Sequence, residues 1–222
     1  LRLGHVVCTD SWSSGGGGCI AAHRAVDLQL VSTAFSSVGA YGNVGGGALL
    51  VNDVSRVQLQ DVVATRTSAL RGSGGVALLR LSAVPFASVV MRGFSSDNSS
   101  AGEHGGAVAV ELGAATSGTV DFADVHIFHA LAGADGGALR VLAVPSTSLH
   151  SSLSEPFVEV RRSSFDACSA GGSGGALSVD GAQSFTLTES GVTNSSAGSN
   201  GGAIAVLRSG FYTSTCSFVT WS

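Results

Sequence analysis

The stretch Gly46-Gly47-Ala48-Leu49-Leu50-Val51 decides the fold: a glycine pair is followed at once by a short apolar run. Similar stretches recur through the 222-residue chain, with steps between first glycines of 29, 28, 31, 31, 38 and 27 residues. The seven pairs are Gly17-Gly18, Gly46-Gly47, Gly74-Gly75, Gly105-Gly106, Gly136-Gly137, Gly174-Gly175 and Gly201-Gly202. A near-constant step in this range is typical of solenoid proteins.

Short alternating runs follow the glycine pairs, as in Ala176-Leu177-Ser178-Val179. A period of two indicates a strand with one buried face. The predicted inward rows are Ile20, Leu49, Ala77, Val108, Leu139, Leu177 and Ile204, and beside them Ala22, Val51, Leu79, Val110, Val141, Val179 and Val206. Arg80, Arg140 and Ser178 are expected on the outward face. A second alternating strand precedes each corner, and Phe35, Phe94, Phe128, Phe165 and Phe218 are expected to stack in one row between the strands.

These patterns predict an all-β fold, a right-handed single-stranded parallel β-helix of about seven coils of 27–31 residues. Glycine suits each corner because it tolerates positive φ and close backbone approach. A leucine-rich repeat has a similar period, but its spaced leucines and Asn are missing here. Residues 1–222 are expected to form one segment of a longer polypeptide, with an inserted Ser/Pro-rich loop at about 145–156 where the step lengthens to 38.

Composition narrows the function classes. The net charge is −4 and the 11 basic residues are all scattered arginines, which disfavours nucleic acid as a partner. The chain contains no run of about 18 apolar residues, so the sequence predicts no membrane-spanning helix. The six histidines are dispersed, so neither a metal site nor a cofactor is expected.

The repeats resemble those of the chlamydial polymorphic outer membrane proteins, whose units carry a Gly-Gly-Ala-(Ile/Leu/Val) motif and a Phe-x-x-Asn motif. Five corners match the first motif, from Gly46-Gly47-Ala48-Leu49 to Gly201-Gly202-Ala203-Ile204. The second is altered, with Cys168 in place of Asn in Phe165-Asp166-Ala167-Cys168. The resemblance implies a β-helix displayed at a cell surface and acting in adhesion, and similar repeats occur in large extracellular proteins of algae and other microbes.

One set of outward residues has a catalytic interpretation. Counting from the corners places Asp121, Glu159 and Thr186 at the same outward position of consecutive coils, with Arg161 two residues further along that face. Carboxylates on adjacent strands would lie roughly 5 Å apart, as in a retaining glycosidase. The alternative is a surface carboxylate pair offset by Arg161. We favour it because a sugar-cleaving site usually also needs aromatic platforms and several further polar groups, which cannot be assembled from the sequence.

The chain also contains candidate modification sites and cysteines. Asn98-Ser99-Ser100 and Asn194-Ser195-Ser196 are N-glycosylation sequons at matching places in their coils, although such asparagines also serve as turn residues. Cys8 and Cys19 share the first coil and are a candidate disulfide, whereas Cys168 and Cys216 are expected to be about two coils apart. The alternative is four buried thiols. Glu103-His104 and Asp135 precede adjacent corners and are expected to be solvated turn residues.

The expected function is therefore non-enzymatic: a structural or adhesive segment of a large extracellular or cell-surface protein, acting as a rigid rod for display or assembly. Its expected partners are other protein chains, further coils of the same polypeptide and glycans. Two alternatives remain open. One is a carbohydrate-active enzyme, a polysaccharide lyase or glycoside hydrolase that uses Asp121, Glu159 and Arg161, and the other is a scaffold subunit of a filamentous surface appendage.

Overall fold

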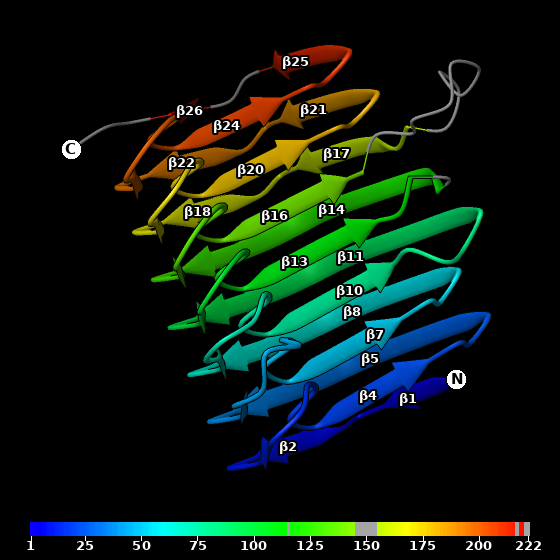
Figure 1. Cartoon of the computed structure of the whole chain (residues 1–222). Helices are drawn as coiled ribbons and strands as arrows, with labels where there is room; N and C mark the ends of the chain where they lie inside the picture. The colour runs from blue at the N-terminus through cyan, green and yellow to red at the C-terminus, as the bar shows by residue number, and fades with distance from the viewer. Residues whose placement is uncertain (115, 145–154, 216–217, 220–222) are drawn as a thin grey trace.

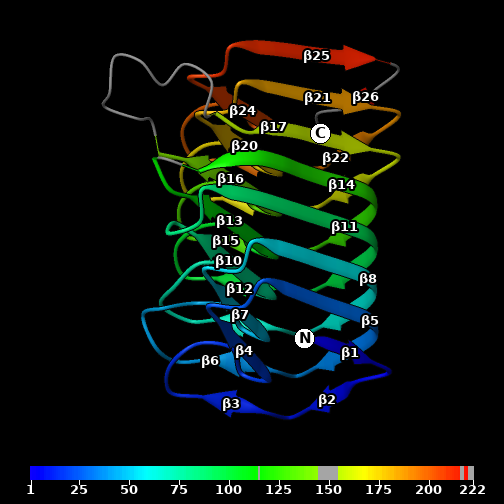
Figure 2. The same ribbon diagram turned by 90° about the vertical axis from the view of Figure 1, so that its right-hand side faces the viewer.

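The computed structural model describes residues 1–114, 116–144, 155–215 and 218–219, and over these residues the chain is all-β, without a helix. Three parallel sheets run along a solenoid of about seven turns, and strands β1 and β25 lie at opposite ends of the stack (Figure 1). Viewed from the side, each coil lies directly on the one before it (Figure 2). The predicted parallel β-helix is confirmed.

Each sheet takes one part of every coil. The long-strand sheet contains β1 (Arg2–Gly4), β2 (Val7–Thr9), β5 (Asp27–Ser36), β8 (Arg56–Thr65), β11 (Phe86–Asp97), β14 (Ser117–Phe128), β17 (Phe157–Arg161), β18 (Ser164–Asp166), β21 (Ser184–Thr188), β22 (Gly191–Thr193), β25 (Phe211–Thr215) and β26 (Phe218–Val219). The two-residue sheet contains β3 (Trp12–Ser13), β6 (Gly39–Ala40), β9 (Ser68–Ala69), β12 (Ser100–Ala101), β15 (Leu131–Ala132), β19 (Ser169–Ala170) and β23 (Ser196–Ala197). The post-glycine sheet contains β4 (Ile20–His23), β7 (Leu49–Asn52), β10 (Ala77–Leu81), β13 (Val108–Leu112), β16 (Leu139–Ala143), β20 (Leu177–Asp180) and β24 (Ile204–Leu207).

The post-glycine sheet has the register that the glycine spacing predicts. Its strands pair in one row of Cα partners: Ile20, Leu49, Ala77, Val108, Leu139, Leu177 and Ile204. The outward face differs from the expectation, because Ser178 is only 1% exposed and Leu50, Leu78 and Ala109 form a small second apolar cluster there. The corner backbone lies against this face, as Gly17 does against Leu50, and shields it from solvent.

The two glycines of each corner have different roles. The first glycine has a positive φ in all seven corners, from 59° at Gly201 to 69° at Gly74, a conformation that costs other residues free energy. The second has no positive φ, but in the consecutive corners from Gly47 to Gly175 an added Cβ would overlap the carbonyl oxygen of the second glycine in the next coil. Corner stacking therefore needs glycine for backbone conformation at one position and for space at the other.

The expected row of stacked phenylalanines is wrong. Phe165 faces Val192 on one side and Ile127 on the other, and the row continues through Ser96 and Ala64 to Phe35. Phe94 lies two residues before that row, Phe128 lies one residue after it and is half-buried, and Val219 rather than Phe218 pairs with Val192. A shift of one residue moves a strand side chain to the opposite face, so an approximate spacing cannot place it.

A single large apolar cluster fills the solenoid from Ala22 to Ala203, and the fully buried rings of Phe35, Phe94, Phe122, Phe165 and Phe185 are among its largest members. Most of the predicted loop at 145–156 lies outside the described residues. Over the part of the chain that the structure describes, we find no helix of the length and apolarity needed to cross a membrane.

Candidate functional site

The candidate catalytic residues lie together on the outward face of the long-strand sheet. Asp121 on β14 and Glu159 on β17 are Cα partners, and Thr186 on β21 continues their row. Arg161 lies two residues beyond Glu159, on the same face. Counting back from the glycine corners therefore places Asp121 and Glu159 correctly, although the step between their two corners is 38 residues.

Asp121 is held by arginines from both neighbouring coils. Its Oδ2 lies 3.0 Å from Nη2 of Arg161 and 3.6 Å from Nη2 of Arg92. The carboxylate side chain is only 20% exposed, and its Oδ1 is buried without a hydrogen-bond partner among the described residues. Glu159 is exposed and makes no ion pair in the described part of the chain. The two carboxylates therefore have different environments, one fixed between arginines and one open to solvent.

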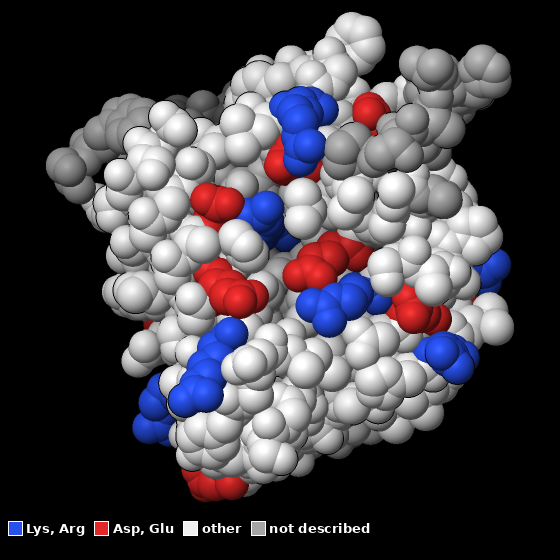
Figure 3. Space-filling view, in the orientation of Figure 1, with Lys and Arg blue, Asp and Glu red and all other residues white. Residues whose placement is uncertain are grey.

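Other charged side chains also pair between adjacent coils. Arg162 donates to both carboxylate oxygens of Asp124 at 2.9 Å, and this hydrogen bonding lowers the pKa of Asp124 and raises that of Arg162. Arg208 binds Asp180 in the same bidentate way at 2.7 and 2.6 Å, which raises the pKa of Arg208. Acidic and basic side chains are interspersed on the face seen in Figure 3, so no patch of one sign forms there.

Of the residues expected to be solvated turn residues, Glu103 is exposed, whereas His104 and Asp135 are partly buried. Their side chains are 31% and 28% exposed, and both contact Arg140, whose side chain is 11% exposed. Nδ1 of His104 accepts hydrogen bonds from Nη1 of Arg140 at 2.9 Å and from the backbone N–H of Asp135 at 3.2 Å. Arg140 also binds Oδ2 of Asp135 directly. Arg140, on the outward row of the post-glycine sheet, thus forms a partly buried polar cluster with His104 and Asp135, which directly precede glycine corners.

Titration in this cluster follows from its burial and its neighbours. Burial, and then the positive charge of Arg140, lowers the pKa of His104 below its ordinary value of 6.5. Since Nδ1 accepts two hydrogen bonds, the neutral ring carries its proton on Nε2. Burial favours a higher pKa for Asp135, but the backbone N–H of Ser173 and the hydrogen bond from Arg140 outweigh it, so the pKa of Asp135 is lowered. The arrangement favours a neutral histidine between a fixed carboxylate and a fixed arginine.

Both sequon asparagines lie at the same position of their coils, in the turn that directly follows a strand of the long-strand sheet. Asn98 and Asn194 are exposed and have positive φ values of 57° and 50°. Nδ2 of Asn194 donates to Oδ1 of Asp166 at 2.9 Å, and the hydroxyl of Thr193 donates to the same atom, which lowers the pKa of Asp166. The two asparagines therefore serve as left-handed turn residues while their side chains remain at the surface.

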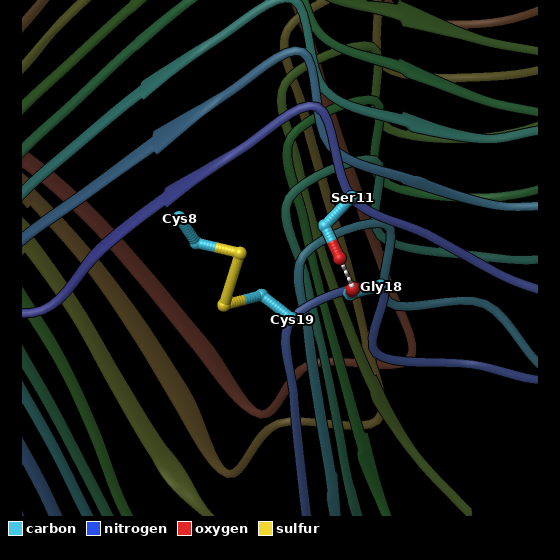
Figure 4. The surroundings of a disulfide bond; sticks show 4 residues. All are labelled: Cys8, Ser11, Gly18 and Cys19. Carbon is cyan, nitrogen blue, oxygen red and sulfur yellow. Dashed lines mark hydrogen bonds between the residues drawn. A yellow bond between two sulfur atoms is a disulfide. The ribbon is translucent and has the colours of Figure 1, made fainter.

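The structure joins Cys8 and Cys19 by a disulfide that closes the segment between them (Figure 4). Inside this segment, the hydroxyl of Ser11 donates to the carbonyl oxygen of Gly18 at 2.6 Å, so the segment is closed a second time. Cys168 is buried, and burial raises the pKa of its thiol to about 12, which keeps it protonated and unreactive. Cys216 lies outside the described residues. Among those residues, no group of three or more His, Cys, Asp or Glu side chains could hold a metal ion.

An exposed aromatic pair on the two-residue sheet was not predicted. The rings of Trp12 and Tyr41 stack with centroids 4.7 Å apart and an interplanar angle of 24°, and the two residues are 46% and 53% exposed. Both residues lie five positions before the first glycine of their corner, and this shared distance could have predicted that they are neighbours. The register itself pairs Trp12 with Gly39, and the missing side chain of Gly39 makes room for the indole ring.

Comparison of the chain with protein-family models, with curated proteins and with solved structures finds no match in any of the three.

Proposed function

We propose that this chain is a rigid, non-enzymatic structural or adhesive segment of a large extracellular or cell-surface protein, used for display or assembly. The pairing of charges between neighbouring coils is the observation that carries the proposal. These pairs are Arg161 with Asp121, Arg92 with Asp121, Arg162 with Asp124, Arg80 with Glu111 and Arg208 with Asp180. Each pair adds a side-chain contact to the backbone ladder that already joins the coils, which favours a stiff rod.

Two features support an extracellular location. Disulfides such as that between Cys8 and Cys19 persist in oxidising compartments. Asn98 and Asn194 are exposed, as acceptors of N-linked glycans must be. The resemblance of the repeats to polymorphic outer membrane protein repeats points in the same direction. Mass spectrometry of the protein isolated from its source tests this location: we expect Cys8 and Cys19 to resist alkylation without reductant, and free thiols at both positions would contradict it.

A carbohydrate-active enzyme is the second candidate, and two observations favour it. Glu159 is an exposed carboxylate whose Cα partner is Asp121. Phe157, two residues earlier on the same face, is 52% exposed and provides an apolar surface beside the carboxylates. Against this candidate, the side chain of Asp121 is only 20% exposed and its carboxylate is bound to Arg161 and Arg92, which leaves little of it accessible to a substrate.

One experiment separates the two candidates. The wild type, Asp121→Asn and Glu159→Gln are incubated with a panel of polysaccharides, and released reducing ends and unsaturated sugars are measured beside the free energy of unfolding. The rod proposal predicts no release from any protein and a loss of stability in Asp121→Asn alone. Release by the wild type that both substitutions abolish would overturn it in favour of the enzyme.

A further inference from the structure

The exposed Trp12–Tyr41 pair belongs to two rows of uncharged residues, which the exposed side chains of Arg71 and Glu103 border on one side. The outward row of the two-residue sheet and the residues that directly follow its strands make up this surface, here called the uncharged strip: Trp12, Gly39, Ser68, Ser100, Leu131, Ser169 and Ser196 in the row of the sheet, and Tyr41, Leu70, Gly102, Gly133, Gly171 and Gly198 in the row that follows it. Figure 2 shows β3 and β6, which carry the start of the first row, at the N-terminal end of the stack. The strip contrasts with the paired charges of the long-strand sheet.

The aromatic pair is held in place although it is exposed. Stacking covers one face of each ring and leaves about half of each residue to solvent. The ring carbons of Trp12 occupy the space beside Gly39 where a side chain would otherwise lie. Trp12 also belongs to the segment closed by the Cys8–Cys19 disulfide and by the Ser11–Gly18 hydrogen bond. A large aromatic surface is thus fixed in advance, which lowers the entropy cost of binding.

Hydroxyl groups follow the aromatic pair along the same strip. Ser68 and Ser100 are the next residues of the Trp12 row, and Oγ of Ser100 donates to Oγ of Ser68 at 3.0 Å. No hydrogen bond within the described chain uses the proton of Ser68, so that proton is available to a ligand. A surface with exposed aromatic faces, adjacent hydroxyls and no charge matches the chemistry of an uncharged sugar, whose ring has an apolar C–H face and a rim of hydroxyls.

We infer that the uncharged strip binds a neutral polysaccharide, with one pyranose ring packed against the stacked pair of Trp12 and Tyr41 and the sugar chain continuing over Ser68 and Ser100. A protein partner fits the strip less well. The apolar part is small beside the roughly 800 Å² that each partner buries in a stable protein interface, and serine is depleted from such interfaces. This inference goes beyond the rod role, which stands whether or not the strip binds sugar.

Isothermal titration of the intact chain with neutral hexasaccharides of glucose, xylose and mannose, and with hexagalacturonate as the acidic comparison, tests the inference. We expect at least one neutral hexasaccharide to bind and hexagalacturonate to bind at least tenfold more weakly. Trp12→Ala and Tyr41→Ala are each expected to weaken neutral binding at least tenfold. Phe86→Ala is the matched control, because Phe86 is an exposed aromatic of the long-strand sheet, and it is expected to leave the affinity unchanged.

Gly39→Ala provides the sharpest variant, because it removes no aromatic group. Its new Cβ would strike the indole ring of Trp12 and displace it, while the φ of Gly39 lies in a range that alanine adopts. We expect this variant to keep the circular dichroism spectrum of the wild type and to bind the sugar at least tenfold more weakly. Binding of none of the neutral hexasaccharides, unchanged affinity in Trp12→Ala and Gly39→Ala, or self-association of the chain that Trp12→Ala abolishes would each overturn the inference.

Discussion

On the outward face of the long-strand sheet, Asp121 is held by Arg161 and Arg92, whereas the two rows of the uncharged strip carry aromatic, leucine, serine and glycine residues only. Both faces are built on the same coils with the same corners. Charged side chains that pair with one another stabilise the stacking of the coils, and few of their hydrogen-bonding groups remain free to bind a ligand. The aromatic pair also joins two coils, but it leaves about half of each residue open to a partner. We therefore propose that one face supports the rod and that the other binds a ligand.

The largest expected effect removes the scaffold that both faces share. Gly106→Ala places a Cβ against the carbonyl oxygen of Gly137 in the next coil, and neither backbone can move without breaking the corner. We expect a loss of about 3 kcal/mol or more in the free energy of unfolding, measured with urea. Gly191→Ala is the control, since an added Cβ there meets no atom within 4 Å, and it is expected to change stability by less than about 1 kcal/mol. Equal losses in the two variants would contradict the role given to the second glycine.

A somewhat smaller effect is expected where the disulfide supports the binding face. Replacing Cys8 and Cys19 by serine frees a segment with a sequence separation of 11, for which loop closure predicts a loss of about 3 kcal/mol at most. Hydrogen exchange should show the loss mainly in residues 8–19, because the other coils keep their ladders. Faster exchange spread evenly over all the coils would mean that the disulfide stabilises the whole solenoid and not the segment that bears Trp12.

Asp121→Asn tests the charged face. It leaves Arg161 and Arg92 without their shared carboxylate, and we expect a loss of about 1–2 kcal/mol in the free energy of unfolding. Glu159→Gln changes a carboxylate in the same row that is exposed and has no ion pair in the described chain, so we expect less than about 0.5 kcal/mol. If the two substitutions cost the same, ion pairing is not what distinguishes the two carboxylates.

The pH dependence of the free energy of unfolding tests the polar cluster of His104, Asp135 and Arg140. Because the pKa of His104 is lowered below 6.5 in the folded chain, the unfolded chain binds more protons just below that pH. The stability that neutral His104 contributes is therefore complete above about pH 6.5 and is lost as the pH falls through the folded-state pKa. His104→Gln should flatten urea midpoints measured between about pH 5 and 6.5, whereas losses below about pH 4, where Asp124, Asp135 and Asp166 protonate, should remain. An unchanged slope in the first range would contradict the assignment to His104.

The sequence predicts those parts of the fold in which the backbone conformation accepts only one type of residue. Glycine pairs marked every corner, because a positive φ and a close approach between coils recur there. The distance from the corner to the post-glycine sheet is constant, so the inward rows were predicted correctly, and the row of Asp121 and Glu159 was counted from the corners as well.

Where the number of residues between a strand and the next glycine corner varies, prediction fails. The segment from the two-residue sheet to the glycine pair is longer in the second coil than in the first, so Trp12 pairs with Gly39 and not with Tyr41. The prediction of stacked phenylalanines failed for another reason, because these residues lie at different distances from their corners: Phe165 is nine residues before Gly174, whereas Phe128 is eight before Gly136. Contacts such as that between His104 and Arg140 depend on how a side chain extends from one coil to the next. Neither the repeat period nor the hydropathy pattern specifies this.

The most direct test is the midpoint of thermal unfolding with and without each neutral hexasaccharide, for the wild type, Asp121→Asn and Trp12→Ala. Because a ligand that binds only the folded chain raises the midpoint, one scan reports both stability and binding. We predict that Asp121→Asn unfolds about 3–6 °C below the wild type but keeps its shift with sugar, whereas Trp12→Ala unfolds within about 2 °C of the wild type and loses the shift. A lost sugar shift in Asp121→Asn together with a retained shift in Trp12→Ala would contradict the division of the two faces.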